Sequence, residues 1–292
     1  MPVDLENDVE PMVFGLDKGY IDAHVHLWTD DFSKYPLASG FTPADLAVRR
    51  FMPADILAKA KRNGVQRVVL VQMSYYGFDN SLMLDAIARY PSRFRGIAVI
   101  DVDAKEPGET MRRLAGSHVR GFRIMALDPA ARPLDRAGLK KMFQCGATEN
   151  LAMCFLTSPE FLPGIGSLCD EFPETPVVID HMARIGMDGT IRSNDVDALC
   201  RLAKYPRTMV KISAFYALGR KQPPHDDLAP LIHSLVTAFG PSRLMWASDA
   251  PFQLMHESYR DSIGLVREWL PFLSSSDKDE ILRGSAEKLF FR

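Results

Sequence analysis

Hydrophobic and polar positions along the chain predict strands and helices that alternate. The run over residues 67–72 is continuous and rich in β-branched residues, which is typical of a strand buried on both faces. Residues 53–63 have apolar positions at helical spacing and end before Gly64, a residue type expected just after a helix. Eight strand-like runs follow one another: 21–28, 67–72, 94–100, 119–124, 151–156, 176–180, 209–212 and 244–246.

This alternation predicts the fold class. Eight strand and helix units, without a glycine-rich dinucleotide fingerprint after the first strand, favour an α/β protein with a (β/α)8 (TIM) barrel over a doubly wound sheet. Helical patterns over residues 259–270 and 276–291 would close the barrel. We therefore expect an N-terminal arm over residues 1–19 and one barrel domain over residues 20–292.

Composition narrows the function. The 292 residues include 35 Lys and Arg against 37 Asp and Glu, so no overall positive charge would attract nucleic acid or an anionic membrane. No apolar stretch is long enough to span a bilayer, and the N-terminus lacks a signal-peptide pattern. The four cysteines are widely spaced, which argues against a zinc ribbon or a disulfide framework and predicts a cytoplasmic protein. Nothing in the sequence indicates the oligomeric state.

The candidate catalytic residues lie where predicted strands end. His24 and His26 end the first strand, and their spacing places both imidazoles on one face. His181 follows the sixth strand and Asp249 the eighth. Catalytic groups of such barrels gather at the carboxyl ends of the strands, so we expect these four residues to meet. Taken singly, His181 could instead satisfy a loop carbonyl, and Asp249 could cap the turn after Pro251.

Three further strand ends suggest substrate contacts. Gln72 and Ser74 follow the second strand, and Arg123 lies in the fourth. A guanidinium can bind a carboxylate with two parallel hydrogen bonds, which makes Arg123 the candidate for anion recognition. The alternative is an ion pair with Asp101 or Asp128. We assign no role to the remaining histidines, which lie before a strand, in a loop or on helices: His118, His225, His233 and His256.

Three segments resemble the amidohydrolase superfamily, in the branch that includes sugar-acid lactonases and 2-pyrone-4,6-dicarboxylate lactonases. These are IDAHVHLW at 21–28, VVIDHM at 177–182 and LMWASDAP at 244–251. Similarity to the pyrone lactonases extends to residues 71–74, 77–80, 84–89 and 95–101. The resemblance implies a barrel hydrolase that opens a lactone, in the breakdown of aromatic compounds. It implies Asp249 as general base toward water, the three histidines around the scissile carbonyl, and Ser74 and Arg123 at a substrate carboxylate.

The chain departs from the pyrone lactonases at three places. They carry a further arginine where this chain has Asp128-Pro129, a tyrosine on the fifth strand where it has Phe155, and an arginine after the seventh strand that is displaced here, with Arg220 nearby. The expected partner is therefore a small anionic lactone that is pyrone-dicarboxylate-like, muconolactone-like or sulfonated muconolactone-like.

Metal use stays open. The wider superfamily often bridges two ions with a lysine or glutamate from the fourth or fifth strand, which this chain lacks, so a two-metal centre is not expected. One zinc or manganese ion could be held by His24, His26, His181 and Asp249, or the imidazoles could polarise the carbonyl without a metal. A metal-dependent decarboxylase of an unsaturated or aromatic carboxylate, and a non-catalytic binding barrel, are the alternative functions.

Overall fold

A computed structural model describes residues 19–127 and 134–292, so nearly all of the predicted arm lies outside the described residues. Eight parallel strands form one sheet in the order of the chain, and the predicted barrel is confirmed. Each strand lies within a few residues of its predicted run. The strands are β1 (Tyr20–Val25), β2 (Val65–Val71), β3 (Phe94–Ala98), β4 (Val119–Ala126), β5 (Ala152–Thr157), β6 (Val177–Ile179), β7 (Thr208–Ser213) and β8 (Leu244–Ala247).

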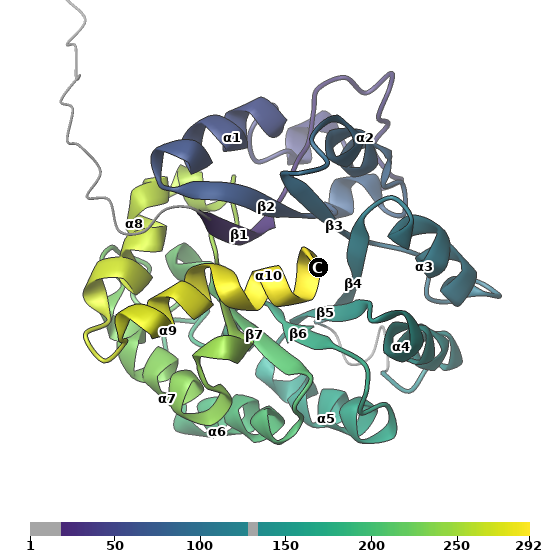
Figure 1. Cartoon of the computed structure of the whole chain (residues 1–292). Coiled ribbons are helices and arrows are strands. Elements are labelled where there is room, and N and C mark those ends of the chain that lie inside the picture. Colours follow the sequence, from purple (N-terminus) through teal and green to yellow (C-terminus); the bar gives the residue numbers. More distant parts are fainter. Residues whose placement is uncertain (1–18, 128–133) are drawn as a thin grey trace, which may run out of the picture.

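Helices surround the strands, as Figure 1 shows. They are α1 (Pro53–Arg62), α2 (Ser81–Arg89), α3 (Pro107–Ala115), α4 (Ala137–Glu149), α5 (Leu162–Glu171), α6 (Ser193–Arg201), α7 (Ala229–Phe239), α8 (Tyr259–Gly264), α9 (Ser275–Asp279) and α10 (Ser285–Phe290). The last two predicted helices each contain a wider π turn, at Leu265–Trp269 and Glu280–Gly284. Among the described residues, no helix combines the length and apolar character needed to cross a membrane.

The strands are buried on both faces, which explains their continuous apolar runs. A compact cluster fills the barrel interior and includes Val69, Ile97 and Cys154. A larger cluster packs the outer face of the strands against the helices. Phe155 belongs to that outer cluster and its ring lies 6.1 Å from that of Phe143. The residue that replaces the family's tyrosine therefore points toward helices and away from the barrel interior.

The first and last strands meet at the carboxyl end of the barrel. Val25 forms an isolated parallel bridge with Ala250, and the His26 amide donates to the Ala250 carbonyl at 2.8 Å. The Asp249 amide donates to the His24 carbonyl at 3.0 Å. Pairing of β1 with β2 shifts in register between Asp22 and Val25, an irregularity of the kind that redirects side chains. Closure of the barrel thus brings the H-x-H segment beside the strand-eight aspartate.

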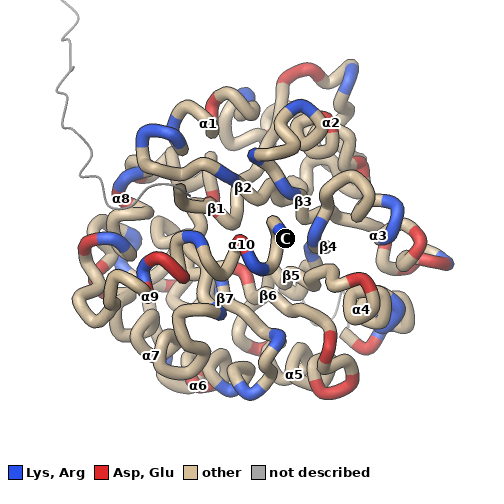
Figure 2. The backbone as a smooth tube through the Cα atoms, in the orientation of Figure 1, with Lys and Arg blue, Asp and Glu red and all other residues tan. Residues whose placement is uncertain are grey.

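Helix α10 closes the opposite end of the barrel, where it lies across the strands in Figure 1. Ala286 and Phe290 join the interior cluster. The ring of Phe291 lies 4.8 Å from the Arg67 guanidinium and 4.9 Å from that of Arg95, near the amino ends of β2 and β3. Figure 2 shows the basic positions of these strands around the end of α10. This end is filled, so the carboxyl end is the one that remains for a site.

Candidate functional site

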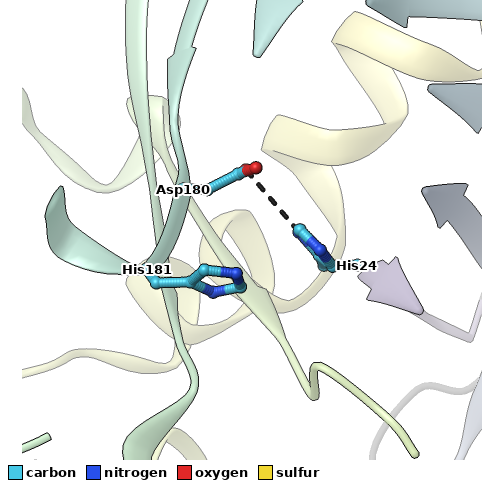
Figure 3. Close-up of side chains that lie close together, drawn as sticks. All are labelled: His24, Asp180 and His181. Atoms are coloured by element: carbon cyan, nitrogen blue, oxygen red, sulfur yellow. Dashed lines mark ion pairs between the residues drawn. The ribbon is translucent and has the colours of Figure 1, made fainter. Parts of the chain in front are cut away.

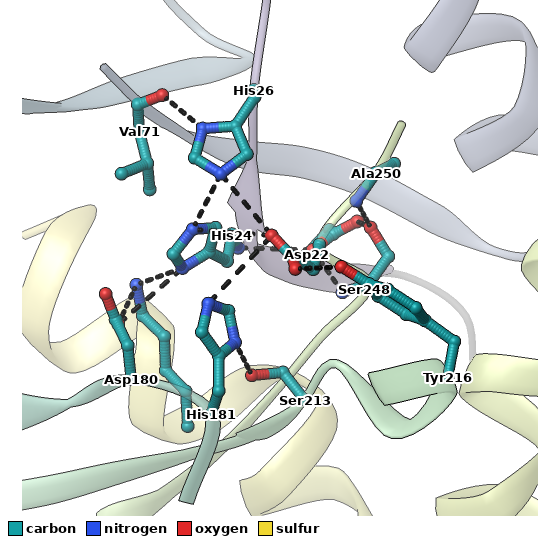
Figure 4. Close-up of polar contacts among 12 residues, drawn as sticks. Asp22, His24, His26, Val71, Asp180, His181, Ser213, Tyr216, Ser248 and Ala250 are labelled. Atoms are coloured by element: carbon teal, nitrogen blue, oxygen red, sulfur yellow. Dashed lines mark hydrogen bonds and ion pairs between the residues drawn. The ribbon is translucent and has the colours of Figure 1, made fainter. Parts of the chain in front are cut away.

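The four predicted catalytic residues meet at the carboxyl end of the barrel. Figure 4 shows the three histidines, His24, His26 and His181, close together. Oδ1 of Asp249 lies 3.4 Å from Nε2 of His26, 3.7 Å from Nε2 of His24 and 3.9 Å from Nε2 of His181. All four side chains are buried. Asp249 Oδ1 makes no hydrogen bond of acceptable geometry within the described residues. One carboxylate oxygen therefore faces three imidazoles, an arrangement that can take up and return a proton.

The backbone at two of these residues is strained. His181 and the three residues after it have φ angles of 50° to 58°, and Asp249 has a φ of 64°. Residues other than glycine avoid this left-handed region, and such strain is concentrated at functional sites. The local alternatives fail for both side chains. His181 contacts the Ser213 hydroxyl at 2.8 Å and not a loop carbonyl, and Asp249 contacts the histidines and a tyrosine and caps no turn.

The second oxygen of Asp249 is held by Tyr216, a residue that the sequence did not indicate. The Tyr216 hydroxyl donates to Oδ2 at 2.8 Å, and its ring stacks on His256 at 5.0 Å. Burial and the neighbouring Asp249 raise the pKa of Tyr216, so the phenol stays protonated and donates. Burial alone would raise the pKa of Asp249, but the adjacent histidines, His181 foremost, hold it below its usual value. Asp249 is therefore an ionised carboxylate at neutral pH.

A buried ion pair lies behind His24. Figure 3 shows Asp180, His181 and His24 side by side. Nζ of Lys211, on β7, lies 3.0 Å from Oδ1 of Asp180 and 3.2 Å from Nδ1 of His24, and neither Lys211 nor Asp180 has any exposed side-chain area. Burial, reinforced by the Lys211 charge, holds the pKa of His24 well below its usual value. Burial would raise the pKa of Asp180, but Lys211 and His24 hold it well below its usual range.

Lys211 was not predicted from the sequence, although one signal for it exists. It is a lysine in the middle of TMVKIS, a strand whose neighbouring positions are apolar. A charged residue in such a strand must be paired, because leaving an isolated charge in the barrel interior would cost several kcal/mol. Its partner, Asp180, lies directly before His181 in the segment VVIDHM at 177–182.

A second buried carboxylate, Asp22, joins the two halves of the site. It accepts hydrogen bonds from the backbone amides of His24 at 3.2 Å and Ser248 at 2.9 Å. The hydroxyls of Ser248 and Tyr259 also donate to it, at 2.5 and 2.7 Å. Burial raises its pKa to about 6, although these hydrogen bonds oppose the rise. Asp22 thus fixes the backbone next to both His24 and Asp249.

The proposed substrate contacts differ in their surroundings. Arg123 is half-buried and pairs in register with Cys154 of the interior cluster. Its side chain therefore projects from the inner face of β4. Its charge is one of the causes that lower the pKa of His181. Ser74 is half-buried at the start of a 3-10 turn, whereas the Gln72 amide donates to the Asp79 carbonyl and holds the loop. Arg123 is thus the better placed of the three to meet an anion.

Two alternatives for the arginines can be compared with the structure. Within the described residues Arg123 forms no ion pair with Asp101, and Asp128 lies outside the described part. Arg220, the nearest match to the displaced family arginine, is exposed and forms ion pairs with Asp226 and Asp227. Arg220 therefore does not replace that arginine in the site.

Among residues 19–127 and 134–292, two groups of side chains have the composition of a metal site. His24, His26 and Asp249 form one, and His24, Asp180 and His181 form the other, each with ligand atoms within 4.8 Å of one another. Strands β4 and β5 contain no lysine, glutamate or histidine, so they supply no bridging ligand for a second ion.

Comparison with known proteins extends these observations. The sequence profile of a family described as Amidohydrolase matches residues 21–292. A 4-sulfomuconolactone hydrolase of Rhizobium radiobacter is 30% identical over 293 residues, covering 96% of this chain and 92% of the relative. An L-fucono-1,5-lactonase of Burkholderia ambifaria is 28% identical over 249 residues, covering 82% and 83%. The crystal structure of an amidohydrolase of Burkholderia multivorans with bound zinc superposes with a TM-score of 0.79 at 20% identity, covering 93% and 99%.

Proposed function

Since the chain belongs to the amidohydrolase family, we propose that it is a lactonase that opens an anionic lactone by base-assisted attack of water. The observation that carries the proposal is the ionised Asp249, with one oxygen facing three imidazoles and the other held by Tyr216. Two similar proteins are a sulfomuconolactone hydrolase and a fuconolactonase, which supports lactones as the substrate class.

In this mechanism Asp249 takes the proton from water as the water oxygen bonds to the lactone carbonyl carbon. Oδ1 is the oxygen that is free to accept it, because Oδ2 accepts from Tyr216. Imidazole N–H groups that face the site stabilise the negative charge that develops on the carbonyl oxygen. The ring C–O bond then breaks, the leaving oxygen takes a proton, and a new carboxylate and one released proton remain. A low pKa keeps Asp249 ionised, although it also makes the carboxylate a weaker base.

The choice between anionic and neutral lactones rests on Arg123. The two relatives illustrate both possibilities, because one name specifies a sulfonated lactone and the other a sugar lactone. The Arg123 side chain projects from the inner face of β4 on the side of His181. We therefore assign it the binding of a carboxylate or sulfonate of the substrate. Ser74 is the second proposed contact.

We further propose that the group formed by His24, His26 and Asp249 can bind one zinc or manganese ion. The ion would polarise the lactone carbonyl as a Lewis acid. His26 fits this role, because its Nδ1 donates to the Val71 carbonyl at 2.8 Å and leaves the Nε2 lone pair for a cation. Asp249 fits through Oδ1. His24 fits only if its proton lies on Nδ1, so its hydrogen bonds decide how well the set binds an ion.

We propose that the protein is located in the cytoplasm. All four cysteines are free thiols, and three of them are buried. This usage supports a reducing compartment such as the cytoplasm.

Incubation of the enzyme with candidate lactones and with their ring-opened acids over a pH series tests the function. Ultraviolet absorbance follows ring opening and a gas assay follows carbon dioxide. We expect interconversion in both directions without gas, with ring closure favoured as the pH falls because opening releases a proton. Stoichiometric carbon dioxide would establish the decarboxylase instead. Binding without turnover of any lactone would indicate a non-catalytic barrel.

A further inference from the structure

Lys211 is a buried charged group that the mechanism above does not use. It lies beneath the site on β7, with no exposed side-chain area, and its ammonium contacts His24 and Asp180. Exchange of such a pair for apolar residues is often neutral or stabilising, so stability alone does not account for it. Its contact with His24 has a chemical consequence, because the ammonium can only donate.

Lys211 determines which nitrogen of His24 carries the proton. A lysine ammonium has three donors and no acceptor. Nδ1 of His24, at 3.2 Å from Nζ, must therefore be the acceptor and carries no proton. A neutral imidazole has one N–H, so the proton of His24 lies on Nε2, the nitrogen that faces Asp249 and His26.

The contact of His24 with His26, on the opposite side of the ring, gives the same answer without the lysine. Nδ1 of His26 lies 2.8 Å from the Val71 carbonyl oxygen, which can only accept. Nδ1 of His26 is therefore the donor, and when the ring carries this one proton its Nε2 is an acceptor. Nε2 of His24 lies 3.2 Å from this atom and must be the donor. Both sides give the same direction, from Lys211 through His24 and His26 to Val71. Figure 4 shows the contacts from His24 through His26 to Val71.

We propose that Lys211 is a positioning residue that fixes His24 as the Nε2–H tautomer and so makes it a hydrogen-bond donor to the substrate carbonyl. This proposal rests on the proposed function, which identifies the substrate carbonyl as that of a lactone. Asp180 holds the ammonium in place at 3.0 Å. When the lactone binds, its carbonyl oxygen replaces His26 Nε2 as the acceptor from His24.

The same contacts indicate what happens without the lysine. Oδ1 of Asp180 lies 3.6 Å from Nδ1 of His24 and is the nearest alternative partner. If Lys211 is removed, this carboxylate accepts from an Nδ1–H, and the tautomer reverses. Nε2 of His24 then has a lone pair and no proton. The donor to the carbonyl is lost, while His24 gains the form that binds a cation.

The tautomer can be measured directly in the wild-type protein. Enzyme that contains 15N-labelled histidine is stripped of metal with a chelator, and two-dimensional long-range 1H–15N spectra separate the two tautomers. A His24→Gln variant assigns the signals. We expect the Nε2–H pattern for His24 and the Nδ1–H pattern for His26. An Nδ1–H pattern or a doubly protonated ring at His24 would overturn the proposal. This measurement involves no substrate, so it stands apart from the test of lactone hydrolysis.

Lys211→Met is the matching variant, with Lys204→Met as control, because Lys204 is exposed and precedes the same strand. For Lys211→Met we expect the His24 pattern to reverse and kcat to fall about 10²–10³-fold, the usual effect of losing one oxyanion donor, with KM little changed. Lys204→Met should change neither. Retention of the Nε2–H pattern in a folded Lys211→Met protein would contradict the proposal.

Metal affinity is a third readout that does not require activity. Competition with a coloured chelator should show that Lys211→Met binds zinc about 10–100-fold more tightly than wild type. Arg123→Met removes a nearby positive charge without touching His24 and separates the tautomer from simple charge repulsion. An equal gain in Arg123→Met would assign the effect to charge and would overturn this part of the inference. If Lys211→Met fails to fold, the wild-type spectra still decide the question.

Discussion

The two ends of the barrel are built on opposite principles. Around α10 the interior is filled by apolar side chains such as Ala286 and Phe290 in ordinary backbone conformations. At the carboxyl end, buried carboxylates, imidazoles and an ammonium replace apolar residues, and His181 and Asp249 adopt left-handed backbone. The difference separates stability from chemistry, because buried charges add little net stability but allow pKa values, proton positions and hydrogen-bond directions to be fixed.

One side chain connects the two ends. Nζ of Lys211 lies 5.9 Å from the ring of Phe290 and 3.2 Å from His24. The apolar interior therefore reaches up to the ammonium, whose position is fixed by its contacts with Asp180 and His24. Substitutions at the two ends should have different effects, which allows the separation to be tested.

The largest effect is expected from Asp249→Asn. The amide keeps the shape of the side chain but cannot take a proton from water, and a general base contributes about 10²–10⁴-fold to turnover. We expect kcat to fall by that factor in a variant that still unfolds cooperatively in urea. Asp101→Asn, an exposed aspartate beyond β3, is the control and should retain the wild-type rate. Wild-type turnover by Asp249→Asn would remove this residue from the mechanism.

Phe290→Ala should have the complementary effect at the other end. Truncation of a fully buried phenylalanine leaves a cavity and costs about 3–5 kcal/mol of unfolding free energy. Urea unfolding measures this loss, and kcat of the folded fraction should stay within about threefold of wild type, less than the effect of any oxyanion donor. Phe291→Ala, at a half-buried position, should lose less stability. Loss of turnover without loss of stability would show that the two ends are not separable.

The apolar end of this comparison could be predicted from the sequence more fully than the polar end. Runs such as RVVLV record burial on both faces of a strand, so the eight strands and their order followed from pattern alone. The convergence of His24, His26, His181 and Asp249 followed from the rule that strand ends meet in a barrel.

The contacts behind the catalytic residues could not be predicted in this way. Asp22 and Tyr259 are 237 positions apart, and Lys211 and His24 are 187 apart, so only the closed barrel makes them neighbours. Phe155 illustrates the same limit. Its side of the strand depends on the register of β4 with β5, which composition does not reveal. The same is true of Tyr216, whose loop conformation places its hydroxyl on Asp249.

Asp22 should give the catalytic end a pH dependence of its own. Its pKa is raised from 3.8 to about 6, so the folded state binds more protons than the unfolded state between these values. The contribution of Asp22 to the unfolding free energy should therefore fall by about 3 kcal/mol in total as the pH rises from well below 3.8 to well above 6. The lowered pKa values of Asp180 and Asp249 act in the opposite direction, and their contribution is lost only as the pH falls below about 4.

Asp22→Asn removes the pH-dependent contribution of the Asp22 carboxyl to the unfolding free energy. Urea unfolding at about pH 4, pH 5 and pH 6.5 should show a wild-type decline that is reduced in the variant by about 2 kcal/mol, whatever the overall stability of the variant. Asp279→Asn, an exposed aspartate of α9 near the other end, should keep the wild-type slope. Equal slopes in wild type and Asp22→Asn would show that the carboxyl of Asp22 does not retain its proton on folding.

The smallest effect is expected from Arg123→Met, and it concerns one class of substrate only. Loss of a charge-assisted hydrogen bond to a substrate anion should cost about 1.5–3 kcal/mol, which lowers kcat/KM for anionic lactones roughly 10–150-fold. Neutral lactones should be opened at nearly the wild-type rate, because Arg123 lies on β4 and forms none of the hydrogen bonds that hold Asp249 or His24. Arg113→Met, an exposed arginine of α3, carries the same charge change and should affect neither class. Equal losses for charged and uncharged lactones would mean that Arg123 supports the architecture of the site and does not select the anion.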